Sequence, residues 1–193
     1  MASLLRVGEY EASCVVNHGA FPVWRKIAVA NMAASKSSSG TESMKTASVN
    51  GLTTDFSLIG QMDGAQHGLW NAVVELWAWA MKQEISLIRQ AIHPGYCGWV
   101  IGHPAVQNYE TGVLSVGPDS PRVIRCCLKP VGVAVFDHCA GVAHYCYEAQ
   151  VQMPDSSSGS SSQICGRWSE FYMQQSGKWL MVSVSGGPDG QRQ

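Results

Sequence analysis

The sequence contains little charge. Of its 193 residues, 14% are Asp, Glu, Lys or Arg, and 13 basic residues balance 14 acidic ones. It has no cluster of basic residues that could bind the phosphates of a nucleic acid or an anionic membrane surface. We therefore expect neither a nucleic acid nor a membrane as a partner.

Long apolar runs and regularly spaced cysteines are also missing. Lys82 and Glu84 interrupt the longest apolar candidate, which falls short of the roughly 20 residues that a membrane-spanning helix needs. The seven cysteines show no repeated spacing and follow no clear secretory signal, which disfavours an extracellular disulfide framework. We expect a soluble, cytoplasmic protein whose cysteines are reduced.

The first 65 residues have no sustained hydrophobic period. Residues 33–46 are rich in serine and other small side chains, which bury too little apolar area to offset the entropy lost on ordering. We predict a poorly ordered N-terminal extension over residues 1–65. No acidic residue occurs between Glu11 and Glu42, so a transit peptide to an organelle is the weaker alternative to a cytoplasmic location.

Order is expected to begin near Gln66 with a helix. Large apolar residues then recur at steps of three or four, which is the spacing of one apolar stripe along a helix. They are Trp70, Val73, Val74, Trp77, Met81, Ile85, Ile88 and Ile92. Pro94 disfavours helical geometry at His93, so the pattern predicts one long amphipathic helix ending there, followed by a glycine-rich loop over residues 95–104.

The hydrophobic period changes to two in the second half of the chain, as is typical of strands. Five strands are predicted, at residues 122–128, 131–136, 142–151, 164–173 and 179–185. A loop over residues 154–162 and a turn at Gly177 separate the later strands. We predict an α+β fold over residues 66–187, with the N-terminal long helix packed in the concave face of a strongly curved antiparallel sheet, and a flexible tail over residues 188–193.

Five short motifs stand in order along this region. They are Leu76–Ala80, His93–Trp99, Ala143–Tyr147, Gly166–Glu170 and Gly177–Trp179. Together they resemble the nuclear-transport-factor-two-like superfamily, and more narrowly its SnoaL-like branch. The resemblance implies an α+β cone with an apolar pocket at one end and a homodimer paired through the sheet. Members include polyketide cyclases, ketosteroid isomerases, dehydratases and association domains without chemistry, so the fold does not choose a reaction.

Isomerases of this superfamily move a proton with a pocket carboxylate. The resemblance places that carboxylate at Trp99 or Val100, which cannot accept a proton, and the partner donor at Ser169. Simple strand alternation directs Asp137, Glu148 and Glu170 away from the pocket, although one β-bulge would reverse every later assignment. A proton-shuttling isomerase is therefore disfavoured, and no catalytic residue is assigned.

Aromatic residues are the better candidates for contacting a ligand. Tyr145 and Tyr147 share the predicted inner face, where each phenol either orients a ligand oxygen or is satisfied within the core. Arg167 could clamp a carboxylate if it points inward, or pair with Glu148 if it points outward. The predicted ligand-binding residues are Trp77, Tyr96, Trp99, Tyr145, Tyr147, Arg167 and Ser169.

No metal or cofactor is predicted. His138, Cys139, His144 and Cys146 carry suitable side chains, but neighbours on a strand point to opposite faces and no Cys-x-x-Cys spacing exists. The apolar strand contexts of the cysteines raise a thiol pKa rather than lower it, and no nucleotide-binding glycine motif is present.

The leading hypothesis is a SnoaL-like domain that binds a small molecule in an aromatic-lined apolar pocket. One alternative is an enzyme of the cyclase, dehydratase or isomerase kind acting on a small apolar carbonyl compound. Another is a structural homodimerisation module without a ligand. A cavity above roughly 300 Å³ with two or more polar groups converging on it would favour ligand binding.

Overall fold

The computed structural model describes residues 48–49, 51–153 and 161–189. Its helices are α2 (Gly64–Lys82), α3 (Ile85–Ala91) and α4 (Tyr109–Leu114). Its strands are β1 (Ser48–Val49), β2 (Leu52–Thr54), β3 (Cys97–Val100), β4 (Gln107–Asn108), β5 (Arg122–Phe136), β6 (Ala140–Gln152), β7 (Ser161–Gln175) and β8 (Lys178–Pro188). Most of the predicted extension, of the loop over residues 154–162 and of the tail lies outside the described residues.

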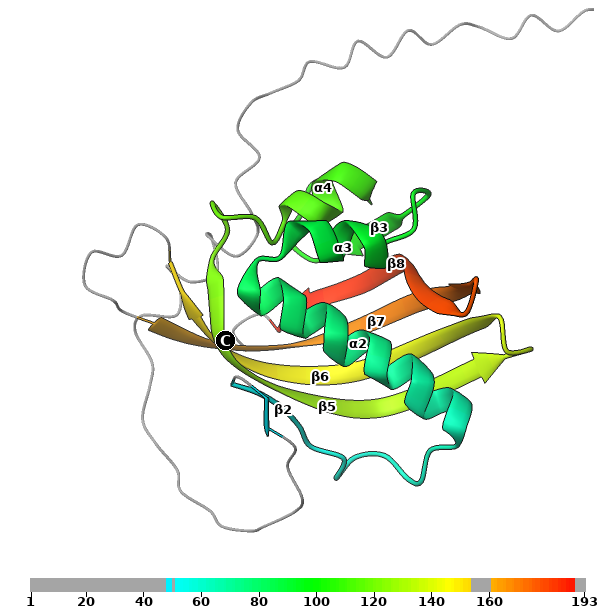
Figure 1. Ribbon diagram of the computed structural model, residues 1–193. Coiled ribbons are helices and arrows are strands. Elements are labelled where there is room, and N and C mark those ends of the chain that lie inside the picture. Colours follow the sequence, from blue (N-terminus) through cyan, green and yellow to red (C-terminus); the bar gives the residue numbers. More distant parts are fainter. Residues whose placement is uncertain (1–47, 50, 154–160, 190–193) are drawn as a thin grey trace, which may run out of the picture.

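One curved sheet wraps around the long helix α2 (Figure 1). Its eight strands are ordered β1-β2-β5-β6-β7-β8-β3-β4. Strands β5 to β8 pair antiparallel, whereas β2 runs parallel to β5 and β3 runs parallel to β8. The predicted α+β class, with a helix in the concave face of a mainly antiparallel sheet, is confirmed. Among the described residues, no helix has both the length and the apolar character needed to cross a membrane.

Helix α2 begins at a capping box. The backbone N–H of Gln66 donates to Oδ1 of Asp63 at 2.8 Å, and the backbone N–H of Asp63 donates to Oε1 of Gln66 at 2.8 Å. Each bond satisfies a backbone donor that the first helical turn leaves without a partner. The side-chain amide of Gln66 also donates to the carbonyl of Val133 on β5 at 2.8 Å, which attaches the start of the helix to the sheet.

Replacing Asp63 with Ala removes one half of this capping box. We expect the free energy of unfolding to fall by about 1 kcal/mol, the usual effect of losing an N-cap side chain. Urea denaturation measures it, with His67→Ala as the matched control because His67 is exposed in the same turn. Equal effects of the two substitutions would show that the cap contributes nothing.

The prediction of a single helix up to residue 93 is wrong. Gln83 has a φ of 57°, in the left-handed region, and separates α2 from α3. Its side-chain amide donates to the carbonyl of Gly117 at 2.7 Å, which holds the break against the segment that precedes β5. The apolar stripe continues across the break, since Met81 and Ile88 are both buried.

The two strands predicted at residues 122–128 and 131–136 are one strand, β5. A bulge interrupts its pairing with β6 between Pro130 and Gly132. From Cys126 to Pro130 the even-numbered residues face the core, and after the bulge odd-numbered residues such as Val133 do. The sequence pattern changes phase there, which imitates the end of a strand. Bulges also bend a strand and increase its twist, which contributes to the curvature of the sheet.

Two short parallel strands were not predicted. Strand β2, which contains the buried Leu52, lies within the predicted extension, so the folded region begins before Gln66. Strand β3 lies within the predicted loop over residues 95–104. Both strands have four residues or fewer, too few to show a period of two.

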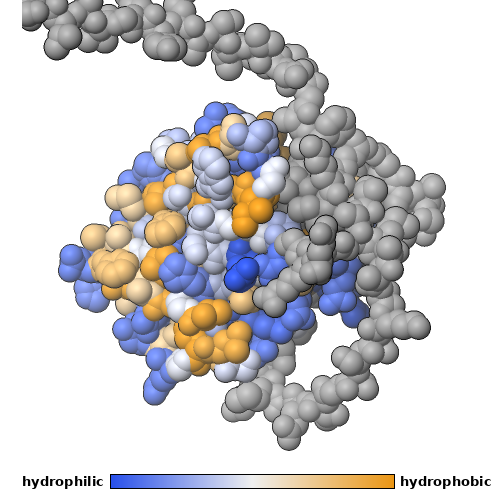
Figure 2. All heavy atoms as spheres, turned by 180° about the vertical axis from the view of Figure 1, so that it is seen from behind, coloured by the Kyte–Doolittle hydropathy of each residue, from blue (hydrophilic) through white to orange (hydrophobic). Residues whose placement is uncertain are grey.

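The outer face of the sheet carries apolar side chains. Phe171 and Met173 on β7 are 42% and 44% exposed and alternate with buried residues. Phe136 at the end of β5 is 55% exposed. Viewed from behind, the molecule shows apolar patches among hydrophilic ones on this side (Figure 2).

Candidate functional site

A cavity of about 310 Å³ lies between the helices and the sheet. Apolar side chains from α2, α3, β5, β7 and β8 form most of its wall, among them Leu76, Ile88, Val123, Trp168, Met181 and Val184. This volume equals that of roughly ten water molecules at liquid density. It therefore suits a molecule of one or two fused rings.

Glu170 on β7 lines this cavity and is 5% exposed. The hydroxyl of Tyr145 donates to its Oε1 at 2.6 Å, and the hydroxyl of Tyr172 donates to its Oε2 at 2.6 Å. The indole N–H of Trp77 donates to the Tyr145 hydroxyl at 2.7 Å. An indole N–H can only donate, so the Tyr145 oxygen accepts from it and directs its own proton to Glu170. The direction of this hydrogen-bond chain, from α2 to the carboxyl, is therefore fixed.

Burial dominates the ionisation of this cluster. It raises the pKa of Glu170 above its ordinary value, although the two phenol hydroxyls act in the opposite direction. Burial, reinforced by the Glu170 charge, also raises the pKa of Tyr145 and of Tyr172. The phenols thus stay protonated near neutral pH, and the carboxyl is the group of the cluster that can gain or lose a proton.

The prediction that Glu170 points away from the pocket is wrong, and so is the inward placement of Arg167. The register of β7 decides both. Ala143 of β6 faces the core and pairs with Glu170, and directly opposed residues share a face of the sheet. Arg167 is on the outer face, where its Nη2 lies 2.8 Å from Oδ1 of Asp189.

Ser169 also lies on the outer face, with its hydroxyl 2.7 Å from Nδ1 of His144. Glu148 on the same face pairs with Lys129 at 2.6 Å, so the alternative pairing of Arg167 with Glu148 is not formed. Neither Ser169 nor Arg167 is placed to contact a ligand in the cavity.

The other predicted ligand-binding residues are aromatic and mostly buried. Trp77 lines the cavity, and its ring centroid lies 5.4 Å from that of Tyr147. Tyr145 and Tyr147 face inward as expected but lie behind the cavity wall. Tyr96 is 5% exposed and its ring packs against the backbone around Gly112, while Trp99 is 56% exposed.

Four polar residues of the wall were not predicted from the sequence: His103, Gln107, Thr111 and Ser115. His103 follows β3 in a turn, where its N–H donates to the carbonyl of Val100 at 3.0 Å. Gly102 in this turn has a φ of 85°, which favours glycine and reverses the chain toward the cavity. A glycine directly after a short apolar segment was the available signal.

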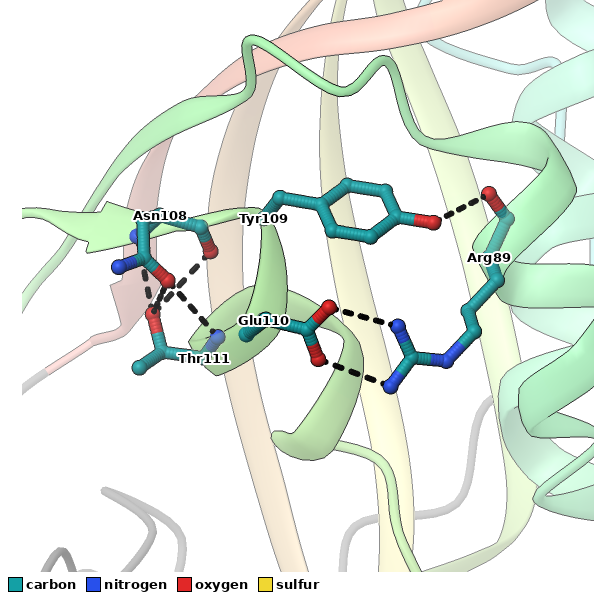
Figure 3. Close-up of polar contacts among 5 residues, drawn as sticks. All are labelled: Arg89, Asn108, Tyr109, Glu110 and Thr111. Carbon is teal, nitrogen blue, oxygen red and sulfur yellow. Dashed lines mark hydrogen bonds and ion pairs between the residues drawn. The ribbon is translucent and has the colours of Figure 1, made fainter.

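Helix α4 covers one side of the cavity and is attached to α3 (Figure 3). The guanidinium of Arg89 donates to both carboxylate oxygens of Glu110, each at 2.8 Å. The hydroxyl of Tyr109 donates to the carbonyl of Arg89 at 3.0 Å. The ion pair raises the pKa of Arg89 and lowers that of Glu110. These contacts fix which face of α4 is turned to the cavity.

The start of α4 is stabilised separately. Asn108 and Thr111 form a capping box, in which the backbone N–H of each donates to the side-chain oxygen of the other at 2.9 and 3.1 Å. Thr111 lines the cavity, but its hydroxyl is engaged in this box. The hydroxyl of Ser115, also in the wall, donates to the carbonyl of Gly112 at 2.7 Å.

Comparisons with known proteins identify this architecture. No protein-family model and no curated protein matches the sequence. A ketosteroid isomerase-like protein from Erwinia carotovora atroseptica superposes with a TM-score of 0.57 at 8% identity, covering 67% of this chain and 99% of that one. An NTF2-like protein from Cytophaga hutchinsonii superposes with a TM-score of 0.51 at 12% identity, and the match covers 66% of this chain and 100% of that one. The chain has the NTF2-like fold.

A further neighbour with this fold is the CaMKII hub homology domain of Chlamydomonas reinhardtii. It gives a TM-score of 0.52 at 13% identity and covers 66% of this chain and 100% of that one. Identities this low show the NTF2-like fold alone. The predicted superfamily fold is thus confirmed, whereas the SnoaL-like branch stays a prediction.

Within this NTF2-like fold, Glu170 supplies the one carboxyl group that the described residues bring to a largely apolar cavity wall, which also contains the polar side chains of His103, Gln107, Thr111 and Ser115. Among the described residues, no group of three His, Cys, Asp or Glu side chains is placed to hold a metal ion. Burial raises the pKa of the Cys126 thiol, which makes that thiol a poor nucleophile. Glu170 can accept a hydrogen bond, donate one when protonated, or exchange a proton with a bound molecule.

Proposed function

We propose that the chain is a SnoaL-like domain that binds a small, largely apolar molecule in the cavity, with an oxygen of that molecule directed at Glu170. The observation that carries this proposal is a buried carboxyl group in the wall of a largely apolar cavity of about 310 Å³. The phenols occupy one lone pair of each carboxyl oxygen, which leaves capacity for a further bond. A ligand hydroxyl would donate to the carboxylate, and a ligand carbonyl would accept from the carboxylic acid.

Acid–base catalysis is the second candidate, and the raised pKa of Glu170 favours it. In such a reaction the carboxylate takes a proton from the carbon next to a ligand carbonyl and returns it to another carbon, so that the substrate is isomerised without a cofactor. The ketosteroid isomerase-like neighbour supports this reading. Binding alone needs only the cavity, whereas catalysis also needs the proton on Glu170 to exchange with the ligand.

We also propose that two copies associate through the outer face of the sheet. The exposed side chains of Phe171, Met173 and Phe136 support this, because large apolar residues grouped on a surface mark protein contacts. The structural similarity to a CaMKII hub homology domain is consistent with association. Native mass spectrometry of the purified protein reports the number of copies and any retained small molecule together.

Filling the cavity tests the binding function directly. Ala80 on α2 lines the cavity, so Ala80→Trp places an indole inside it. We expect the affinity for the fluorescent probe naphthol to fall at least about tenfold, because the probe and the indole compete for the same space. Fluorescence titration measures the dissociation constant, and thermal unfolding checks that the fold persists.

The matched control is Asn71→Trp, which adds the same side chain at an exposed position of α2. It should leave naphthol binding unchanged. If the two variants bind naphthol equally well, the probe lies elsewhere and the cavity is not the binding site.

A further inference from the structure

The cavity has a second polar side, formed by His103 and Gln107. Nδ1 of His103 is buried and has no hydrogen-bond partner among the residues that the structure describes. Gln107 is 7% exposed, and its side-chain amide makes no hydrogen bond within that same part of the chain. The hydroxyls of Thr111 and Ser115 nearby are already engaged with backbone groups. These two bonds use the hydroxyl protons, so His103 and Gln107 are the side chains on this side whose N–H donors remain available to a ligand oxygen.

Leaving such groups unpaired is costly. A buried polar group without a partner destabilises a protein by about 1–3 kcal/mol, so native structures pair nearly all of them with protein atoms, water or a ligand. Nδ1 of His103 is such a group, and the amide of Gln107 lies in the wall of the same cavity. Contributed by a β-turn and a short strand, the two side chains make a place for a polar atom of the bound molecule.

Glu170 lies on another side of the cavity. It pairs with Val184 on β8, Val184 contacts the position of Gly98 on β3, and Gly98 pairs with Gln107 on β4. Three strand spacings of about 4.8 Å thus separate Glu170 from Gln107 along the sheet, or roughly 14 Å between backbones. Since both side chains extend into the cavity, a bound molecule of two fused rings can reach both.

The Glu170 side of the cavity and the side of His103 and Gln107 differ in the hydrogen bonds that they offer. Glu170 is an acid, whereas the imidazole of His103 and the amide of Gln107 both offer N–H donors. A ligand carboxylate or carbonyl oxygen fits those donors and would be repelled by an ionised Glu170. A ligand hydroxyl fits Glu170.

We propose that the cavity takes a rigid apolar compound with an oxygen function at each end: a hydroxyl or keto oxygen at Glu170 and a carbonyl or carboxylate oxygen at His103 and Gln107. This rests on the proposed binding function and goes beyond it by assigning the two ends of the ligand. His103 and Gln107 then act as the residues that select ligands with an oxygen at the far end.

Three probes of graded structure test this assignment. Naphthol carries one oxygen function. Hydroxynaphthoic acid and acetylnaphthol, with their two groups at opposite ends of the rings, add a charged and a neutral acceptor respectively. We expect one or both of the two-ended probes to bind the wild-type chain about tenfold more tightly than naphthol, as expected for one added hydrogen bond to a buried partner.

The variants His103→Leu and Gln107→Leu should each bring the affinities for the two-ended probes to within about twofold of the affinity of the same variant for naphthol. His67→Leu, an exposed histidine on α2, is the control for loss of an imidazole. Circular dichroism and thermal unfolding check that each variant is folded. If one of the two variants does not fold, the other still tests the assignment.

The outcomes separate this assignment from the proposed function. Equal affinity of all three probes for the wild type, or an equal loss for all three in the variants, overturns the two-ended assignment and leaves the cavity as a binding site. If none of the probes binds, both proposals fail. A preference for the acid over the ketone would support the assignment and show that the side of His103 and Gln107 binds an anionic group better than a neutral one.

Discussion

Replacing Glu170 with Ala is expected to lower the free energy of unfolding by about 4 kcal/mol. The substitution leaves the hydroxyls of Tyr145 and Tyr172 without their acceptor in the core, at about 1–3 kcal/mol each, and adds an empty volume. Urea denaturation at constant pH measures the change. A loss below about 1 kcal/mol would show that the two phenols find other partners and that the cluster contributes little to stability.

Glu170→Gln is the matched variant. The amide keeps the shape of the side chain, accepts from Tyr145 through its oxygen and can donate to the Tyr172 hydroxyl through its nitrogen. At low pH, where the wild-type carboxyl is protonated, we expect the two proteins to differ by less than about 1 kcal/mol. A much larger loss would mean that the site requires the carboxyl group itself.

The difference in the free energy of unfolding between the wild type and Glu170→Gln should also depend on pH. Because burial raises the pKa of Glu170 above 4.5, the folded chain holds this proton more tightly than the unfolded chain does. The stability that this difference contributes is fully present below the pKa of Glu170 in the unfolded chain. It is lost as the pH rises from that pKa to the higher pKa of Glu170 in the folded chain. Between these two pKa values, the wild type should lose up to about 1.4 kcal/mol per pH unit relative to Glu170→Gln. A constant difference between about pH 4 and pH 8 would contradict the shift.

Features set by neighbouring residues were predictable from the sequence. Helix α2 begins where the periodic pattern begins, because Asp63 and Gln66 form a local capping box. Strand β6 has no register shift against β7, so alternation along it correctly placed Tyr145 and Tyr147 inward. The turn at Gly177 likewise depends on its own left-handed φ of 78°.

Features set by pairing between distant segments were not predictable. The face of Glu170 depends on the register between β6 and β7, and a shift of one residue reverses every side chain of a strand. The break at Gln83 carries no glycine or proline and is held by a bond to Gly117, 34 residues away. The polar wall at His103 depends on a turn whose neighbour is the C-terminal strand, where Ile101 bonds to Gly186. The candidate site consists largely of residues of this second kind.

Trp77→Ala should destabilise the chain by about 3–5 kcal/mol, the usual range for removing a buried aromatic side chain. Trp77 is 8% exposed and packs between the rings of Tyr145 and Tyr147, at centroid distances of 6.4 and 5.4 Å. Because Trp77 also lines the cavity, the variant should bind probes larger than naphthol that the wild type excludes. Urea denaturation and probe titration measure the two effects.

The variant Trp77→Phe keeps an aromatic ring but lacks the indole N–H, so it distinguishes the contributions of the two. It keeps most of the packing but removes the donor to the Tyr145 hydroxyl, so we expect a loss of about 1 kcal/mol beyond the change in buried area. A double-mutant cycle with Tyr145→Phe isolates that bond, since the double variant lacks both partners. A coupling energy near zero would show that the indole does not orient the Tyr145 proton. The hydrogen bond from Tyr145 to Glu170 would then form without the indole N–H on α2, and Trp77 would contribute to the cavity through the packing of its ring alone.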